Sequence, residues 1–170
     1  SAASDVYKRQ VLSGFDQTQS YQATIRFVDS QTNTDISNGT LTATQGSTTP
    51  VFGYESYAAS RLGFKGTYAA VSAALSSITW NPTFASGGIS LRISIASMTG
   101  DNDFYDLNSG RYYRYVTAGT AWESARIAAE NVTLFGLRGY LAEINSAAEN
   151  SFIASETAAA NIWIGAREDD

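Results

Sequence analysis

The chain has 170 residues, of which 44% are hydrophobic and 12% aromatic, so it can bury a core and is not a disordered tail. Its formal charge is -5, from 11 basic and 16 acidic residues, and no basic stripe is visible along the sequence, which argues against nucleic acid as a partner. No stretch approaches the roughly 20 apolar residues that a membrane span requires.

The sequence contains neither Cys nor His. Thiol nucleophiles, imidazole bases and the usual zinc sites are therefore ruled out. Phosphate-loop and nucleophile-elbow motifs are also missing, so we predict that this chain is not an enzyme and that it holds no cofactor. The many Ser, Thr, Asn and Gly residues, with few Lys, favour an extracellular or cell-surface β-rich protein.

The first ten residues have the character of a non-native segment. Ser1–Gln10 back-translates in frame into a transposase-type sequencing adapter, and we exclude it from fold reasoning as one would exclude a tag. We therefore expect the chain to be a gene fragment that is open at both ends.

Residues 11–97 are predicted to form an all-β sandwich. Apolar and polar residues alternate in Thr24–Phe27 and most clearly in Ile89–Ile95, while Asn38–Gly39 is a hairpin-turn signal. Thr67–Ile78 instead follows helical spacing, which predicts one or two helical turns between strands.

Three blocks in this region carry a resemblance to a known class of repeat. They are Asn38–Thr42, Leu62–Thr67 and Ala69–Trp80, with Gly-Thr-Leu, Gly-Thr and Ile-Thr-Trp as their characteristic letters. They resemble the cadherin-like and immunoglobulin-like repeats of large bacterial surface adhesins. The resemblance implies a sandwich that spaces neighbouring domains.

Residues 98–109, rich in Asp, Asn, Gly and Ser, are interpreted as a linker. Asp101, Asp103 and Asp106 lie close together there, and such carboxylates bind calcium at cadherin junctions. The segment does not fit the EF-hand template, because Tyr112 stands where the twelfth-position acid belongs. Two interpretations stay open, a linker calcium site and an ordinary solvated acidic loop, and the second is favoured.

Residues 110–170 predict the order strand, helix, strand, helix, strand. Tyr112–Val116 is an aromatic strand. Tyr105, Tyr112, Tyr113 and Tyr115 form a cluster that could stack on a sugar, but the alternation favours core packing. Capping-box spacings begin the two helices, which are expected near Thr120–Asn131 and Ser146–Ser155. The remaining strands are expected at Tyr140–Ile144 and Ile162–Ile164.

This order, together with the spacing of eight residues, resembles the first half of a C-type lectin-like domain. The residues that carry the resemblance are Trp122, Ala125, Leu141, Ile144, Glu149, Phe152, Trp163 and Gly165. In that family they are mostly scaffold. Ala129 stands where many members have a cysteine, so no disulfide is expected. The family's calcium-holding and sugar-holding loops would fall beyond Asp170, so calcium is expected only in the complete domain.

The sequence thus predicts the α+β class, with an N-terminal all-β sandwich followed by a truncated C-type lectin-like domain. The expected function is a binding module of an exported bacterial multidomain protein, which recognises a glycan or a surface protein. Two alternatives stay open, a structural or cohesive spacer array without a sugar site and an accessory region of a secreted enzyme.

Overall fold

The computed structural model of the chain describes residues 14–51, 54, 56–83, 88–99, 102–106, 109–117, 119–157 and 161–165. The adapter-like segment at residues 1–10 lies outside them. The chain divides into two compact units, residues 1–101 (unit 1) and residues 102–170 (unit 2). Strands make up 37% and helices 22% of the structure, with several antiparallel sheets, which confirms the α+β class.

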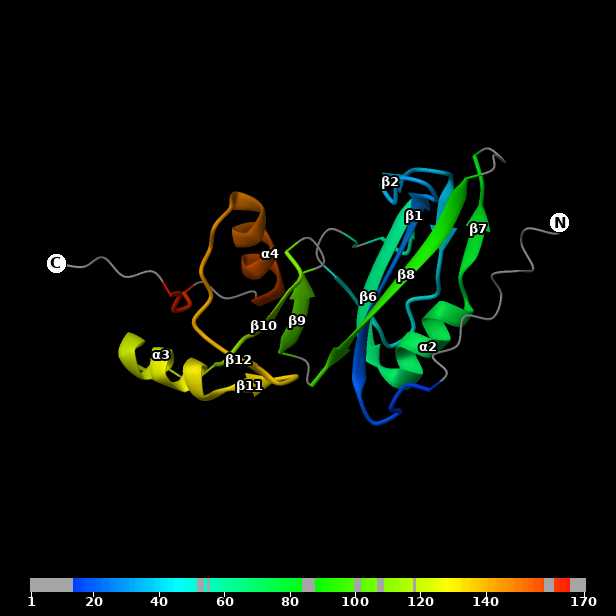
Figure 1. Cartoon of the computed structure of the whole chain (residues 1–170). Helices are drawn as coiled ribbons and strands as arrows, with labels where there is room; N and C mark the ends of the chain where they lie inside the picture. Colours follow the sequence, from blue (N-terminus) through cyan, green and yellow to red (C-terminus); the bar gives the residue numbers. More distant parts are fainter. Residues whose placement is uncertain are drawn as a thin grey trace. The chain divides into compact units, whose positions relative to one another are not determined.

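The larger sheet of unit 1 is built around β1 (Ser20–Asp29), as Figure 1 shows. One edge of β1 pairs along its whole length with β8 (Ile89–Met98). The other edge pairs first with β6 (Arg61–Thr67) and then with β2 (Asp35–Ile36). β4 (Thr49–Pro50) extends the sheet beyond β6, and all of these pairs are antiparallel.

A smaller antiparallel sheet places β3 (Thr40–Thr42) between β5 (Ala58–Ala59) and β7 (Thr79–Asn81). The single helix of the described part of unit 1, α2 (Tyr68–Ser76), packs against β1 and β6. The hydroxyl of Thr67 caps this helix by accepting a hydrogen bond from the backbone N–H of Ala70 at 3.3 Å. The helix predicted within residues 67–78 is thereby confirmed.

The core of unit 1 lies where the two sheets meet α2. Every second residue of β1 faces it, and those side chains meet apolar residues of β3, β6 and α2. Burial of this apolar area is the main stabilising contribution to the unit. The buried core residues are Tyr21, Ala23, Ile25, Phe27, Leu41, Ala43, Leu62, Phe64, Val71, Ala74, Leu75 and Ile78.

The Asn38–Gly39 turn does not make the hairpin that its sequence suggests. β2 pairs with β1 and β3 pairs with β5 and β7, so the chain crosses here from one sheet to the other. Gly39 has a φ of 84°, and a Cβ atom at this position would lie 2.0 Å from the carbonyl oxygen of Asn81. Only glycine fits, because the turn is left-handed and touches a neighbouring backbone.

The described part of unit 2 contains two short hairpins and two helices; Figure 1 shows them. β9 pairs with β10, and β11 pairs with β12, both in antiparallel fashion. In chain order, the elements are β9 (Asp103–Asp106), β10 (Arg111–Arg114), α3 (Trp122–Asn131), β11 (Thr133–Leu134), β12 (Leu137–Arg138) and α4 (Ala147–Thr157).

Strand β9 lies within the segment that was expected to be a linker. Met98, at the start of that segment, is buried at the end of β8, and β9 pairs with β10 over four residues. The strand was not predicted, because Phe104 and Tyr105 are its only apolar residues and turn-forming residues surround it in the sequence.

Both helices of unit 2 lie where they were predicted, but only the second begins as expected. Ser146 Oγ accepts a hydrogen bond from the N–H of Glu149 at 3.1 Å, which confirms that capping box. The box predicted for Thr120 is wrong, because Ala121 is the N-cap of α3 and provides no side-chain hydrogen bond. Glu123 instead forms an ion pair with Arg126 at 2.7 Å.

The strands predicted at residues 140–144 and 162–164 are wrong, since neither segment is a strand in the described structure. Between them, the N–H of Gly165 donates to the carbonyl oxygen of Ala142 at 2.9 Å, but a strand needs a ladder of such bonds. Leu141 and Ile144 are only half-buried, so their alternation does not reflect a fully covered face. The β11–β12 hairpin was not predicted, because four residues provide too short a pattern.

Candidate functional site

The β9–β10 hairpin organises unit 2, because its two faces pack against different elements. On one face, the rings of Phe104 and Tyr113 stack with centroids 5.5 Å apart. Both rings also contact Phe152 of α4, at centroid distances of 5.6 and 6.2 Å. Phe152 is buried, so this face forms the small core that fixes α4 against the hairpin.

The opposite face of the hairpin carries two of the tyrosines that could have stacked on a sugar. The rings of Tyr105 and Tyr112 lie 4.6 Å apart, and Tyr112 also lies 5.1 Å from the ring of Phe135 in the turn between β11 and β12. These rings contact one another, as the alternation predicted. The packing interpretation of the tyrosine cluster is therefore confirmed for Tyr105, Tyr112 and Tyr113.

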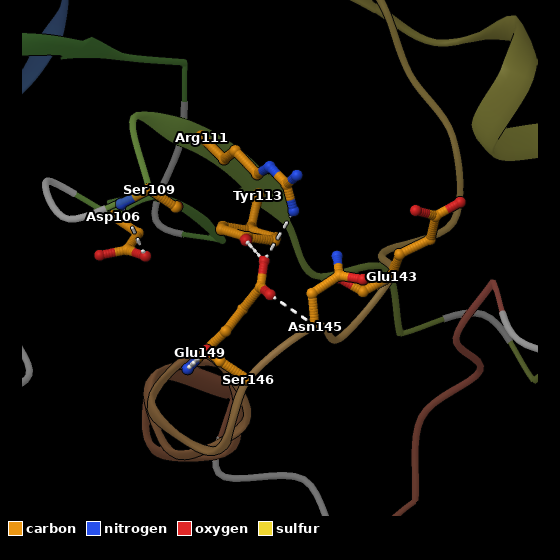
Figure 2. A network of polar contacts seen from close by, with 8 residues as sticks. All are labelled: Asp106, Ser109, Arg111, Tyr113, Glu143, Asn145, Ser146 and Glu149. Atoms are coloured by element: carbon orange, nitrogen blue, oxygen red, sulfur yellow. Dashed lines mark hydrogen bonds and ion pairs between the residues drawn. The ribbon is translucent and has the colours of Figure 1, made fainter.

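A buried carboxylate, Glu149, joins the hairpin to the start of α4, as Figure 2 shows. Its Oε1 accepts hydrogen bonds from the hydroxyl of Tyr113 and, at 2.9 Å, from Nη1 of Arg111. Its Oε2 accepts from the backbone N–H of Asn145 at 2.9 Å. One side chain thus receives hydrogen bonds from β10 and from the residues just before its own helix.

The hydrogen bonds around Glu149 shift the proton equilibria of this cluster. The hydrogen bond from Tyr113, followed by that from the Asn145 backbone, lowers the pKa of Glu149. Burial, followed by the hydrogen bond to Glu149, raises the pKa of Tyr113. At neutral pH, the carboxylate is therefore charged and the phenol is protonated, which is the arrangement that these hydrogen bonds require.

The structure describes two of the three aspartates proposed as a linker calcium site. Asp101 lies outside the described residues. Asp103 and Asp106 are both buried, but they stand three positions apart on β9 and so belong to opposite faces of the strand. Within the described ranges, no three His, Cys, Asp or Glu side chains gather in a way that could hold a metal ion.

Both aspartates of β9 have protein partners. Asp103 lies opposite Arg114 in the strand pair and receives two hydrogen bonds from its guanidinium, at 2.7 and 3.0 Å. Asp106 Oδ2 accepts from the backbone N–H of Ser109 at 3.3 Å in the turn to β10. With only 2% of its surface exposed, Asp103 serves as the buried half of an ion pair.

The two signature tryptophans connect the same two segments. The indole N–H of Trp122 donates to the carbonyl oxygen of Ile164 at 2.7 Å. The indole N–H of Trp163 donates to the carbonyl oxygen of Thr120, also at 2.7 Å. Trp122 is half-buried, whereas Trp163 is 54% exposed.

The remaining signature residues also have structural positions. Ala125, Leu141 and Ile144 are half-buried, and Phe152 belongs to the small core described above. At Gly165 a Cβ atom would lie 2.9 Å from the carbonyl oxygen of Leu141, so the backbone approaches closely there.

Sequence reasoning missed the two arginines that neutralise the buried carboxylates. Arg111 and Arg114 lie at the two ends of β10, in the alternation Arg-Tyr-Tyr-Arg. Each faces an acidic residue of β9 across the pair, Asp106 and Asp103 respectively. Asp103 and Asp106 are three residues apart, as are Arg111 and Arg114, and this equal spacing could have indicated the two pairs. It is informative only when β9 is known to be a strand.

Comparison with known proteins gives one partial similarity. The chain is 38% identical over 78 residues to halomucin of Haloquadratum walsbyi (strain DSM 16790 / HBSQ001), and the match covers 46% of this chain. It spans 1% of the length of halomucin. No family model and no solved structure matches the chain. None of the described helices has both the length and the apolar character needed to cross a membrane.

Proposed function

We propose that this chain is a binding module of an exported, multidomain surface protein, with a sandwich unit followed by a C-type lectin-like unit that recognises a glycan or a protein. The observation that carries the proposal is the similarity to halomucin, a surface protein, at 38% identity over 78 residues. The same similarity supports an extracellular or cell-surface location. It agrees with the composition, which is rich in Ser, Thr, Asn and Gly.

The distribution of exposed apolar side chains supports a contact role for unit 2. Of the seven large hydrophobic side chains that are exposed among the described residues, Phe15 alone belongs to unit 1. Soluble proteins tolerate single exposed side chains, but a concentration of them in one small unit favours a contact surface. The six in unit 2 are Val116, Ile127, Phe135, Leu137, Tyr140 and Trp163.

Apart from the exposed Trp163, the signature residues act as scaffold in this proposal. Phe152 and Glu149 hold α4 to the hairpin, and Trp122 holds the segment around Ile164 to the start of α3. This is the role that the family resemblance implies for them. A ligand of unit 2 would therefore meet the exposed side chains, Trp163 among them, and leave Trp122, Glu149 and Phe152 in place.

One observation favours the second candidate function, a structural or cohesive spacer. Two buried carboxylates of unit 2, those of Asp103 and Glu149, form ion pairs with arginines of the same unit. Loss of either partner would leave a buried charge unpaired, and carboxylates held in this way are not available to a ligand.

Array binding separates the two functions. The purified chain is applied to arrays of neutral glycans, acidic polysaccharides and extracellular proteins, and its retention is measured. A binding module is retained by at least one class, whereas a spacer is retained by none. The matched control is Phe152→Ala, which removes the small core of unit 2 at a cost of about 3 to 5 kcal/mol. A ligand that unit 2 recognises is lost with this variant, while unit 1 keeps its fold.

A further inference from the structure

Three arginines stand side by side across the large sheet of unit 1. Arg26 of β1 lies directly opposite Arg61 of β6 on one side and directly opposite Arg92 of β8 on the other. Residues directly opposite in antiparallel strands point to the same face, with Cβ atoms about 5 Å apart. The neighbours Ile25 and Phe27 face the core, so this arginine row stands on the outer face of the sheet.

The arginine row concentrates positive charge in an acidic chain. The row carries three positive charges, and Lys65 stands on the same face, four residues along β6 from Arg61. Among the described strand residues, Asp35 of β2 is the sole acidic side chain on this face. Like charges in directly opposed positions destabilise a sheet, so an anion bound across the row would relieve their repulsion.

Arg26, at the centre of the row, is only partly satisfied within the protein. Its Nη1 donates to Oδ1 of Asp35 at 2.5 Å. Its Nε is buried, and none of the described residues accepts a hydrogen bond from it. The Arg26 side chain is 23% exposed, so part of the guanidinium can still be reached from outside.

Arg61 is held over an aromatic ring. Its guanidinium carbon lies 4.8 Å from the centroid of the Tyr54 ring, within the range of a cation–π contact. The ring lies on Gly63, where a Cβ atom would come within 2.8 Å of Tyr54 Cβ and Cγ. The absence of a side chain at Gly63 makes room for the Tyr54 ring. The ring orients Arg61, which stays exposed.

A hollow of about 340 Å³ opens beside Arg26 and Arg61. It lies where β1 changes partner, because β6 pairs with β1 as far as Arg26 and β2 begins at Phe27. Its polar lining consists of the two arginines, Ser37, Ser60 and Asp35, the partner of Arg26, and its apolar lining consists of Phe27 and Ile36. Its size is at the small end for ligand sites and suits one sugar ring.

The structure assigns to the arginine row a binding site for an acidic polysaccharide, with carboxylate or sulfate groups on the guanidiniums and one sugar in the hollow at Ser37 and Ser60. Guanidinium groups bind such planar or tetrahedral oxyanions through paired hydrogen bonds. The serine hydroxyls supply partners for sugar hydroxyls. The inference rests on the proposed surface role, since a polysaccharide of this kind is met outside the cell, but it concerns unit 1.

The same face is poorly suited to single-stranded nucleic acid. Such binding needs aromatic rings on which bases stack. The ring of Tyr54 already contacts Gly63 and Arg61, and that of Phe27, which also lines the hollow, packs against Trp80 in the core. The ligand is therefore recognised by charge and hydroxyl groups, without stacking.

Isothermal titration of the full chain tests the site with three polymers, dextran sulfate, polygalacturonate and uncharged dextran. Single-stranded DNA serves as a fourth polymer. We expect one or both acidic polysaccharides to bind, with an affinity that falls as salt rises, and dextran not to bind. Comparison of dextran sulfate with polygalacturonate distinguishes recognition of sulfate from recognition of carboxylate. Equal binding of dextran, or tighter binding of DNA, overturns the inference.

Two variants locate the site. Arg92→Gln should weaken acidic polysaccharide binding by about tenfold, as expected for one charge-assisted contact. The double variant that carries both Arg61→Gln and Arg92→Gln should bind more weakly still. The matched control is Arg138→Gln in unit 2, which removes the same charge from a side chain that is 74% exposed and should change nothing. Thermal unfolding confirms that each variant is folded.

The outcomes separate this inference from the proposed function. If the wild-type chain binds an acidic polysaccharide and Arg92→Gln with Arg61→Gln binds it equally well, the arginine row is not the site, but the binding function stands. The same conclusion follows if neutral glycans or proteins alone are retained. If none of the glycans and proteins binds, both proposals fail.

Discussion

Trp122 and Trp163 hold the same two segments together through reciprocal hydrogen bonds. Trp122 donates its indole N–H to the carbonyl oxygen of Ile164, and Trp163 donates its own to the carbonyl oxygen of Thr120, each at 2.7 Å. The residues around 163 are thus fixed to the start of α3 without strand pairing. Two side chains take over what a ladder of backbone hydrogen bonds would do in a sheet.

The first prediction concerns this pair. Trp122→Phe keeps an aromatic ring but removes the donor, so unit 2 should lose about 1 kcal/mol of unfolding free energy. Urea unfolding followed by circular dichroism measures the loss. Trp80→Phe is the matched control, since it removes an indole hydrogen bond to Asn38 in unit 1 and should leave unit 2 unchanged. An unaltered unit 2 in Trp122→Phe would contradict the structural role of the bond.

The second prediction concerns Glu149. Glu149→Gln removes the charge that Tyr113 and Arg111 share, so unit 2 should lose about 1.5 to 3 kcal/mol, as for other hydrogen bonds to charged groups. Glu143→Gln is the control, because Glu143 is exposed on the preceding segment and its replacement should cost less than about 0.5 kcal/mol.

The same carboxylate gives a pH dependence. Its pKa is lowered in the folded unit, so its contribution is complete above the ordinary value of 4.5 and disappears as the pH falls through the lower, folded value. Thermal unfolding of unit 2 between pH 7 and pH 3 should show this loss in the wild type and a smaller loss in Glu149→Gln. Identical pH profiles would refute the assignment.

The third prediction concerns Asp103. Asp103→Asn leaves Arg114 without its bidentate partner, and unit 2 should lose about 1.5 to 3 kcal/mol. Because this carboxylate is already paired with Arg114, millimolar calcium should not change the melting temperature of unit 2. A calcium-dependent rise that Asp103→Asn abolishes would restore the calcium interpretation.

The fourth prediction compares two glycines of unit 1 with positive φ. Gly39→Ala places a Cβ against the backbone of Asn81, so the cost should exceed that of backbone strain alone, which is about 1 kcal/mol. Gly46→Ala meets nothing within 4 Å and should cost only the strain. Chemical unfolding of both variants measures the difference, and equal costs would show that the contact at Gly39 is relaxed elsewhere.

Periodic patterns predicted the elements that have a long, one-sided pattern of their own. The alternation of Ile89–Ile95 became β8, and the helical spacing after Thr67 became α2, because each buries one face in the core. The strand predicted at Tyr140–Ile144 had the same kind of pattern but only half-buried side chains. Alternation alone does not show whether a partner strand is present.

The arginine row could not be predicted, although Arg26 and Arg92 could each be assigned to an outer face. Arg26 and Arg92 occupy polar positions in alternating strands. What places them beside Arg61 is the register of β1 against β6 and β8, which brings together residues that lie far apart in the sequence. The sequence has no basic stripe, and the sheet assembles one from three strands.

The most direct test of the account is to follow the arginine Nε–H signals of the full chain by NMR during titration with the acidic polysaccharide that binds. The account predicts that the signals of Arg26, Arg61 and Arg92 shift together with one apparent affinity, while those of Arg126 and Arg138 in unit 2 stay in place. Shifts confined to the arginines of unit 2, or a uniform small drift of all signals with added charge, would contradict it.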